Sequence, residues 1–518
     1  MYHVRAAVAA ALFLVSGAMS LAAAPVTLAS PDGGISVTGE FLSFDGEFFR
    51  LDVPEVGVVT LDGGPLACTG EACPARDAFV AQVGFSGARR MGEVLMPALV
   101  ESFALRRGYT AERVEAGADR LQLDLTDPAA GRVIARFTFH LVDTDEGVAD
   151  FLAGEAEIVM ALREVLPAEV EFARSAGVEG FGAPRLARIV GLDAIVPLVS
   201  AASPLRDISM TDLARLYGGR GMAGASGDPV TLHLGPASDG LTQAFARRAA
   251  QSRPVGDAVV RHPDLAAVAD AVARDPMAVG IGSFANQGNA VPLRLIGPCG
   301  YPAEATDRSL KTEDYPLTTP LFLYLPPWRL PEVARDFVDF AVSPGAQPVV
   351  RRTGFVDQFP QAIPLDSQGA RFANAIARAG GDTGLDELQG MVAALDDRAR
   401  LSVTFRFEDG SSRLDAQSRS NVALLAQALN RGVFADRSLL FVGFSDGVGP
   451  AATNRRLARA RAETVRAAVS KAAAEPLDDG AQNRLDLRIA SFGEAMPMAC
   501  DEVEWGRRIN RRVEVWLD

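Results

Sequence analysis

The spacing of apolar and polar residues changes along the chain and divides it into regions of different predicted structure. Over residues 30–75, apolar and polar residues alternate between Asp-Gly breaks, a pattern typical of β-hairpins. From 78 to 364, short apolar runs alternate with segments of helical periodicity, which predicts an α/β arrangement long enough for two lobes. From 399 to 518, strand-like and helical segments alternate again and predict a second α/β domain.

The segment between the two α/β regions has a pattern of its own. Two amphipathic stretches on either side of a Gly-rich break predict two short helices. The predicted organisation is therefore a small β-rich region at 25–77, a bilobal domain at 78–364, a helical linker at 365–398 and a C-terminal domain at 399–518.

The first 24 residues have the pattern of a secretory signal peptide. A basic start is followed by an apolar run at 6–15 and by small residues at 20–24. No cysteine follows the run, which argues against a lipoprotein anchor. No later segment has the roughly 18 consecutive apolar residues needed to cross a bilayer, so the pattern predicts an exported protein that does not span the membrane.

Charge and motif content exclude several classes of function. A net charge of −14 gives no support to binding of nucleic acid or of an anionic membrane, because both require basic patches. The sequence contains no nucleophile elbow, no P-loop and no paired carboxylates in a motif context. We therefore expect a protein that is not an enzyme and that uses neither a cofactor nor a metal.

Four cysteines are too few for a disulfide framework in a chain of 518 residues. Cys68 and Cys73 enclose four residues, and no second pair of zinc ligands lies nearby, so a local disulfide is predicted in an oxidising compartment. Cys299 and Cys500 lie in different predicted domains, and the sequence leaves open whether they are buried thiols or pair with each other.

A candidate binding site lies near the C-terminal end. The apolar run 439–444 predicts a buried strand, and Asp446 follows in the loop at its end. A helix is predicted to begin at about Asn454, so that Asn454 and Arg461 share one face. A carboxylate and a guanidinium across such a loop suit a ligand with both an ammonium and a carboxylate; the alternative is an ordinary surface ion pair.

These residues carry a resemblance to a known family. The pattern Gly-x-x-Asp-x-x-Gly at 443–449, then Leu-Ala-Arg-Ala-Arg-Ala at 457–462, then Asn-Arg-Arg-Val-Glu at 510–514, resembles the OmpA-like peptidoglycan-binding domain over about 403–517. Two departures are mild: Phe-Ser at 444–445 stands where His-Thr is usual, and Ala458 where serine is usual.

The resemblance implies roles for particular residues. Asp446 would hold the ammonium of a diaminopimelate side chain of peptidoglycan, and Arg461 its carboxylate. Asn454, Asn510 and Arg511 would shape the site. The signal peptide together with a domain of this family implies the periplasm of a Gram-negative bacterium, in association with the cell wall.

Several segments of the bilobal region carry a second resemblance, among them GEVLMPALVESFA, GEAEIVMALREV, DPMAVGIGSFA and DFVDFAVSPGAQPVVRRTGFV. In this order they resemble the phosphate-type periplasmic substrate-binding proteins of ABC transporters. The resemblance implies two lobes that close on an oxyanion, with central strands near Val196 and Phe322 passing between them. The predicted fold class is thus α/β: a bilobal periplasmic-binding-protein fold preceded by a small β-rich region and followed by an α/β OmpA-like domain.

Such folds hold an oxyanion with backbone N–H groups at helix N-termini, with hydroxyl groups and with an arginine. Three segments are candidates on this ground: one before the first long helix of the bilobal region, one after the strand GEAEIVMAL, and one at the start of the helix near residue 240. The anion-binding residues predicted from them are Ser86, Gly87, Arg89, Arg163, Ser238, Gly240 and Thr242.

The same segments depart from the family pattern. Ala88, Arg90, Asp239 and Leu241 stand where hydroxyl residues are usual. Each lost hydroxyl would remove a hydrogen bond of about 1.5–3 kcal/mol to a charged acceptor, and Asp239 would repel a dianion unless a protonated ligand oxygen donates to it. The ligand thus stays open between phosphate, another small anionic or polar solute, and none.

The sequence therefore predicts a periplasmic solute-binding protein for phosphate or a related oxyanion, working with an ABC permease and tethered non-covalently to peptidoglycan. The alternative is a wall-bound structural or signalling adaptor whose cleft no longer holds phosphate.

Overall fold

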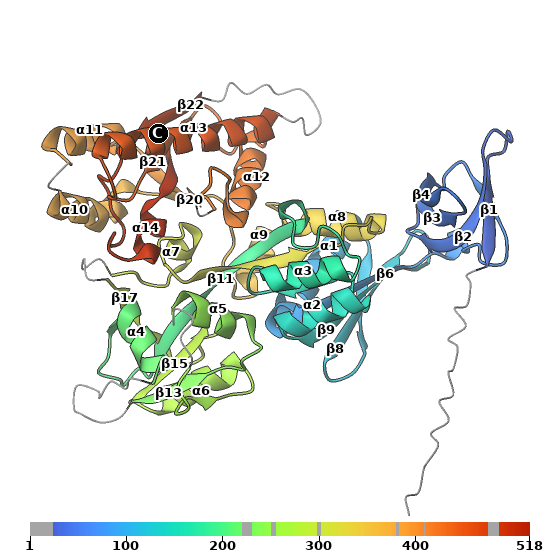
Figure 1. Ribbon diagram of the computed structural model, residues 1–518, viewed down its shortest axis with the longest axis horizontal. Helices are drawn as coiled ribbons and strands as arrows, with labels where there is room; N and C mark the ends of the chain where they lie inside the picture. Colours follow the sequence, from blue (N-terminus) through green and yellow to red (C-terminus); the bar gives the residue numbers. More distant parts are fainter. Residues whose placement is uncertain are drawn as a thin grey trace, which may run out of the picture. The chain divides into compact units, whose positions relative to one another are not determined.

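The computed structural model describes residues 24–219, 230–249, 255–297, 302–379, 383–408, 410–474 and 486–518 (Figure 1). The predicted signal peptide falls almost entirely on residues 1–23, outside this range. The chain forms two compact units, one of the residues up to Ala81 and one of Gln82–Asp518, and each is considered by itself. Within the described ranges, no helix combines the length and the apolar character needed to cross a membrane.

The first unit is an antiparallel sheet in the order β4-β3-β2-β1-β5. Its strands are β1 (Pro25–Ala29), β2 (Ser36–Phe44), β3 (Phe48–Val53), β4 (Gly57–Asp62) and β5 (Ala67–Thr69). Alternating residues such as Leu28, Phe49 and Leu51 form its core, as the period-2 pattern requires. Cys68 and Cys73 form a disulfide with their Cα atoms 5.8 Å apart.

A mixed sheet runs through the bilobal region in the order β14-β13-β15-β11-β18-β10-β6-β9-β8-β7. Its central strands, β11 (Ala187–Val199) and β18 (Thr318–Tyr324), pair with each other and with strands on both sides. They contain Val196 and Phe322 and connect two lobes, so the fold predicted from the sequence is confirmed.

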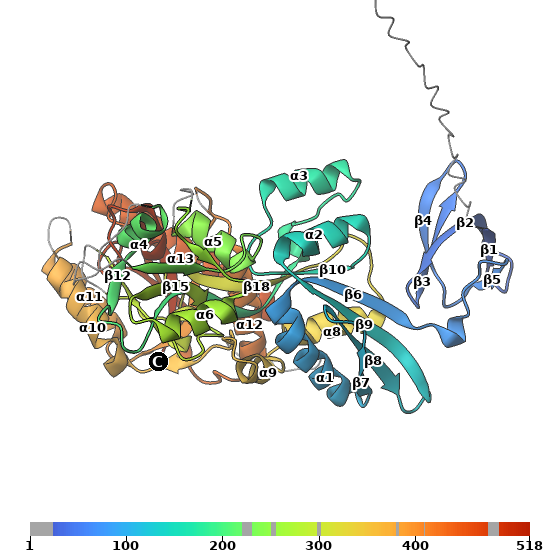
Figure 2. The ribbon, with the colours of Figure 1, turned by 90° about the horizontal axis from the view of Figure 1, so that it is seen from below.

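The first lobe lies on the β10 side of the central strands. It contains β6 (Ala81–Ala88), β7 (Thr110–Glu115), β8 (Arg120–Asp127), β9 (Arg132–Val142), β10 (Ile158–Ala161), α1 (Met96–Arg107), α2 (Thr144–Ala153), α3 (Pro167–Ser175), α8 (Glu332–Ala341) and α9 (Gln347–Arg352). Helices α1 and α8 lie side by side, with the rings of Phe103 and Phe337 5.8 Å apart (Figures 1 and 2).

The second lobe lies on the β15 side. It contains β12 (Asp207–Ser209), β13 (Thr231–Leu234), β14 (Val260–Arg261), β15 (Ala278–Ser283), β16 (Val291–Pro292), β17 (Arg294–Ile296), α4 (Met210–Tyr217), α5 (Gly240–Arg248) and α6 (Leu265–Arg274). Helix α7 (Asp307–Lys311) follows in the chain and contacts β11 and β20. Helix α5 begins with Asp239 as its N-cap, which accepts a hydrogen bond from the Thr242 amide at 2.8 Å.

The C-terminal domain is a sheet in the order β19-β20-β23-β21-β22 with helices on both faces. Its strands are β19 (Ala362–Ile363), β20 (Ala399–Phe405), β21 (Ser438–Phe444), β22 (Asp486–Ser491) and β23 (Arg512–Leu517). Its helices are α10 (Gly369–Arg378), α11 (Leu385–Leu395), α12 (Ala416–Asn430), α13 (Ala451–Ala474) and α14 (Glu504–Asn510).

The segment predicted as a helical linker does contain two helices, α10 and α11. Both lie against the C-terminal sheet, because Leu388, Met391 and Leu395 share one core with Phe444 and Trp516 of the strands. Helices α12 and α13 cover the opposite face. The amphipathic pattern thus predicted the helices, but their apolar faces complete the C-terminal domain rather than form a spacer; residues 380–382 of the break lie outside the described ranges.

A buried charge cluster crosses this domain. Glu514 of β23 is fully buried and is contacted by three guanidinium groups, those of Arg371, Arg400 and Arg512. Arg512 Nε lies 2.7 Å from the Glu514 carboxylate, and Trp516 Nε1 donates to it at 3.1 Å. Burial favours the neutral acid, but the three cations more than offset it and hold the pKa of Glu514 well below its usual value.

The bilobal and C-terminal domains are joined by hydrogen bonds and ion pairs. Strand β19 pairs with β20, which ties the end of the bilobal domain into the C-terminal sheet. Arg400 donates to both carboxylate oxygens of Asp314, at 2.6 and 3.1 Å, and Arg406 Nε lies 3.2 Å from Glu313.

Candidate functional site

A cavity of about 710 Å³ lies between the two lobes. Both lobes and the central strand β11 contribute to its walls. Its ionisable side chains are Arg89, Arg90, Glu93, Asp143, Glu146, Asp193, Asp239 and Asp264. Six carboxylates therefore face two guanidiniums, which makes this cleft more acidic than an oxyanion site would require.

Asp193 and Arg90 form the polar floor of the cleft. The Asp193 carboxylate is 2% exposed and accepts hydrogen bonds from Ser283 Oγ at 2.6 Å and from the Ala285 amide at 3.0 Å. Burial raises the pKa of Asp193, and the nearby charge of Arg90 acts in the opposite direction. Arg90 Nη2 donates to the Ala285 carbonyl at 3.4 Å, while its buried Nε has no hydrogen-bond partner among the residues that the structure describes.

Asp239 supplies a carboxyl group whose charge can change near neutral pH. Burial raises its pKa to about 6, although hydrogen bonds from Thr242 oppose the shift. Below that pH the group is neutral and can donate a hydrogen bond to a ligand oxygen.

The structure brings only some of the predicted anion-binding residues to the cleft. Arg89 and Ser238 line it, and Gly240 lies at the start of α5. Thr242 is buried, its amide donates to Asp239, and it is not among the residues that line the cavity.

Ser86, Gly87 and Arg163 are not among the residues that line this cavity. Ser86 is fully buried and donates to Asp150 Oδ2 at 2.5 Å. Gly87 has φ +129°, and a Cβ there would lie 2.1 Å from the Met160 carbonyl oxygen, so strand packing explains the glycine.

Arg163 is held in an ion-pair network outside the cleft. Its guanidinium, 1% exposed, contacts Asp145 and Glu169 at 2.5 Å and donates through Nε to Gln243 Oε1 at 2.6 Å. Gln243 in turn donates to Asp145 Oδ2 at 2.5 Å. Because Gln243 belongs to α5 of the second lobe, this network connects the lobes on one side of the cleft.

Sequence reasoning missed Asp193, which no motif marked. Its signal was a lone acidic residue within the apolar run IVGLDAIVPLV, since a buried strand seldom carries a carboxylate without a specific partner.

The C-terminal candidate site is assembled from three elements. Asp446 follows β21, Arg461 lies on α13 and Arg511 ends α14. Asp446 Oδ2 lies 3.0 Å from Arg511 Nη1. Helix α13 begins at Ala451, three residues before the predicted start at Asn454, since Pro450 supplies the carbonyl that accepts from the Thr453 and Asn454 amides.

Arg461 is the least engaged cation of this site. Its guanidinium lies 5.6 Å from the ring centroid of Phe407, and within the described ranges it makes no hydrogen bond or ion pair. Burial and the charge of Arg511 lower the pKa of Arg461, while Asp446 raises it, so the three charges are close together. The Arg461 guanidinium can therefore bind the carboxylate of a ligand.

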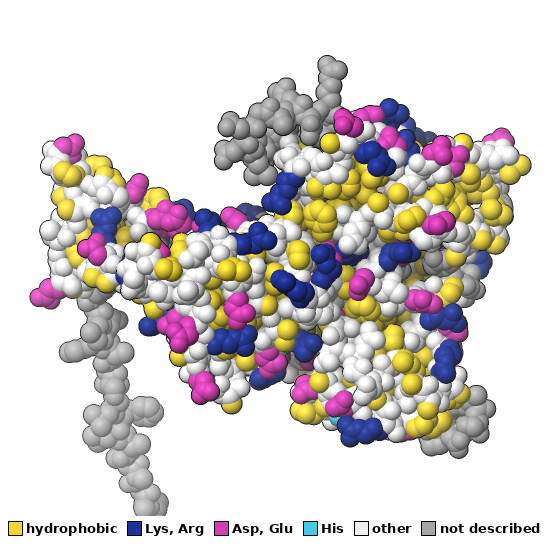
Figure 3. All heavy atoms as spheres, turned by 180° about the vertical axis from the view of Figure 1, so that it is seen from behind, with side chains coloured by type: hydrophobic (Ala, Val, Ile, Leu, Met, Phe, Trp, Pro, Cys, Tyr) yellow, Lys and Arg dark blue, Asp and Glu magenta, His cyan; other side chains and the backbone are white. Residues whose placement is uncertain are grey.

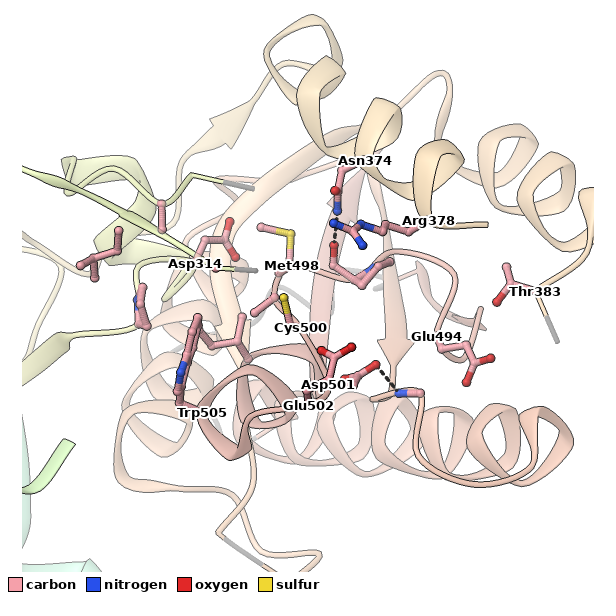
Figure 4. A pocket seen from close by; sticks show the side chains of 18 residues that line it. Asp314, Asn374, Arg378, Thr383, Glu494, Met498, Cys500, Asp501, Glu502 and Trp505 are labelled. Carbon is pink, nitrogen blue, oxygen red and sulfur yellow. Dashed lines mark hydrogen bonds between the residues drawn. The ribbon is translucent and has the colours of Figure 1, made fainter. Parts of the chain in front are cut away.

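Asn454 and Asn510 hold the surrounding loops. Asn454 donates to Glu494 at 3.0 Å, and fully buried Asn510 accepts from the Met498 amide at 2.7 Å and donates to Asp501 at 2.9 Å. Asp501 in turn accepts from the Gly447 amide (Figure 4).

A cavity of about 230 Å³ lies beside this loop, and neither Asp446 nor Arg461 lines it (Figure 4). Cys500 lines this cavity, is 1% exposed and is not a free thiol, whereas Cys299 lies outside the described residues.

Within the ranges that the structure describes, no group of three or more His, Cys, Asp or Glu side chains is placed to hold a metal ion. Acidic and basic side chains are interspersed over the face shown in Figure 3, without an extended basic patch.

Comparison with known proteins places both domains. Residues 123–344 match the PBP superfamily domain and residues 406–511 match the OmpA family. Outer membrane porin F of Pseudomonas fluorescens is 31% identical over 121 residues, which are 23% of this chain and 33% of the porin. The chain thus spans about a third of the length of this curated relative.

Solved structures resemble the two domains separately. An ABC-type phosphate transport receptor from Vibrio cholerae aligns with 54% of this chain and all of its own, at 14% identity and a TM-score of 0.40. The peptidoglycan-associated lipoprotein from Burkholderia pseudomallei aligns with 22% of this chain and 89% of its own, at 24% identity and a TM-score of 0.19.

The two family matches identify each domain. Neither of the two matched families is known as a family of enzymes. The chain combines a solute-binding domain of the PBP superfamily with a C-terminal domain of the OmpA family.

Proposed function

We propose that the protein is a periplasmic solute-binding protein anchored to the cell wall of a Gram-negative bacterium through its OmpA domain. The observation that carries the anchoring is the group formed by Asp446, Arg461 and Arg511. The Asp446 carboxylate would bind the ammonium of diaminopimelate in peptidoglycan, and Arg461 would bind its carboxylate. Arg511, whose Nη1 lies 3.0 Å from Asp446 Oδ2, would hold the Asp446 carboxylate in position.

Sedimentation with purified peptidoglycan tests this assignment. We expect Asp446→Asn and Arg461→Gln each to weaken pelleting at least about tenfold, since each removes a charged hydrogen bond of about 1.5–3 kcal/mol. Arg459→Gln, on the exposed face of the same helix, is the charge-matched control and should pellet as the unaltered protein does. Unchanged pelleting of both site variants would show that the wall is bound elsewhere or not at all.

The cleft is proposed to bind a small oxyanion, phosphate or a relative, for delivery to an ABC permease. Arg90, with its unpartnered Nε, and Asp239, with its pKa near 6, support this proposal. Because carboxylates are in excess, the cleft would bind an anion best when a ligand oxygen is protonated or when the Asp239 carboxyl is neutral. The same excess favours the alternative, a wall-bound structural or signalling adaptor whose cleft holds no phosphate.

Calorimetric titration of the exported chain at several pH values tests the cleft. Phosphate affinity is expected to rise as the pH falls through about 6, because Asp239 then loses its charge and becomes a donor. Asp239→Asn should remove the part of this pH dependence that phosphate protonation does not explain. No heat with phosphate, sulfate or a phosphonate would favour the adaptor.

A further inference from the structure

A second concave surface, separate from the cleft, collects three arginines. Arg247 and Arg248 lie at the end of α5 in the second lobe, and Arg508 lies on α14 of the OmpA domain. All three line a cavity of about 450 Å³ and also a neighbouring one of about 240 Å³. We call the larger cavity the seam, because α5, the segment around Thr318 and α14 meet there.

The three arginines have no carboxylate partner. Within the described part of the chain, none of them makes an ion pair, and the hydrogen bond found is from Arg248 Nη1 to the Thr318 carbonyl at 2.6 Å. Burial, and next the charge of Arg508, lowers the pKa of Arg248 to about 10, although the charges of Glu164 and Glu313 act in the opposite direction.

The carboxylates of the seam have cationic partners other than the three arginines. Glu313 Oε2 lies 3.2 Å from Arg406 Nε, while its buried Oε1 has no hydrogen-bond partner among the described residues, and burial raises the pKa of Glu313 to about 7. Glu504 is bound by Arg507 and lies 3.0 Å from Arg511. Arg406 also donates to the Arg508 and Ile509 carbonyls at 3.0 and 2.8 Å, which holds the last turn of α14. Glu164 lines only the smaller cavity.

We propose that the seam is a second anion site, in which Arg247, Arg248 and Arg508 bind a small polyvalent oxyanion such as inorganic pyrophosphate. Planar guanidiniums match phosphoryl oxygens geometrically, and three of them converge here on a cavity large enough for such an ion. One effect opposes anion binding: the negative end of the α5 dipole already stabilises Arg247 and Arg248, which lie at that end of the helix.

Occupancy of this site would join the two domains. Helix α5 is nine residues long; Asp239 and Leu241 at its start line the cleft, while Arg247 and Arg248 at its end line the seam. An anion shared with Arg508 would therefore connect the OmpA domain to the helix that forms one wall of the solute cleft. By linkage, binding at either place affects the other equally.

Titration of the full exported chain with sodium pyrophosphate tests the site, at low ionic strength so that exposed charges are little screened. We expect Arg247→Gln and Arg508→Gln each to weaken binding about 10- to 100-fold. Arg274→Gln, an exposed arginine on α6 of the same lobe, is the charge-matched control, and Arg90→Gln is the control for the cleft. Neither control should change the affinity.

Trp505 provides a second readout because it lines the seam. Pyrophosphate should change the intrinsic fluorescence of the protein, and Trp505→Phe should remove that change. The proposal would be overturned if pyrophosphate did not bind, or if Arg274→Gln lost as much affinity as the seam variants. It would also be overturned if only Arg90→Gln lost affinity, which would place the anion in the cleft. The titration does not depend on the proposed function, because pyrophosphate can bind at the seam whether or not the protein binds peptidoglycan or a solute in the cleft.

Discussion

Replacing Glu514 with glutamine is expected to lower the free energy of unfolding of the OmpA domain by about 3–5 kcal/mol, the usual effect of removing one partner of a buried ion pair. The carboxylate is fully buried, and it is the shared partner of Arg371, Arg400 and Arg512. Glutamine keeps the shape but removes the counter-charge of Arg371 and Arg512, while Arg400 keeps its ion pair with Asp314.

Urea unfolding followed by Trp516 fluorescence measures this effect, because the indole of Trp516 contacts Glu514. Trp328 and Trp505 would be replaced by phenylalanine to isolate the signal. Glu463→Gln, which removes an exposed carboxylate, is the control and should change stability by less than about 1 kcal/mol. A similarly small change for Glu514→Gln would show that the cluster contributes little.

The pH dependence of the same difference has a defined sign. The pKa of Glu514 is lower in the folded protein than in the unfolded chain, so its stabilisation is fully present above about pH 4.5 and is lost as the pH falls below that value. The stability gap between the protein and Glu514→Gln should therefore narrow in acid.

Arg163→Met is expected to destabilise the solute-binding domain by about 3 kcal/mol. The change leaves Glu169 without its ion-pair partner and removes the link through Gln243 between the lobes. Hydrogen exchange of the Leu166 amide, which Glu169 accepts at 2.6 Å, should accelerate together with the fall in thermal stability.

Arg174→Gln, an exposed arginine at the end of the neighbouring helix α3, is the matched control for this loss. The experiment also decides between two roles for Arg163. A direct anion ligand would lose phosphate affinity on substitution with little loss of stability, whereas the network described here predicts the reverse order.

The sequence predicted those parts of the fold and of the site whose residues lie close together in the chain. The run 439–444, the Asp446 loop and the helix that carries Arg461 follow one another in sequence, so their side chains could be placed together before the fold was known. The same applies to the strands and helices of the bilobal domain.

The parts that escaped prediction depend on distant partners. Ser86 and Arg163 have the chemistry of anion ligands, but Asp150 and Gln243, well separated from them in sequence, satisfy them instead. Asp193 shows the converse: its partner Ser283 comes from another strand, so its place in the cleft had no local sign.

The surface that the two predicted linker helices cover could not be predicted from the sequence for a related reason. Amphipathicity shows that a helix has an apolar face, but it does not identify the surface that the face will cover. Leu388 and Met391 could have met either neighbouring domain, and only the assembled sheet shows that they cover the strands around Phe444.

The passage from one sheet to the next has a mechanical consequence. Val356 pairs with Leu192 of β11, and only a few residues later Ala362 pairs with Leu401 of β20. The two pairings leave only a short stretch of chain between the sheets. If the OmpA domain holds the wall as proposed, a pull on that domain would reach β11 through paired strands and not through an extensible tether.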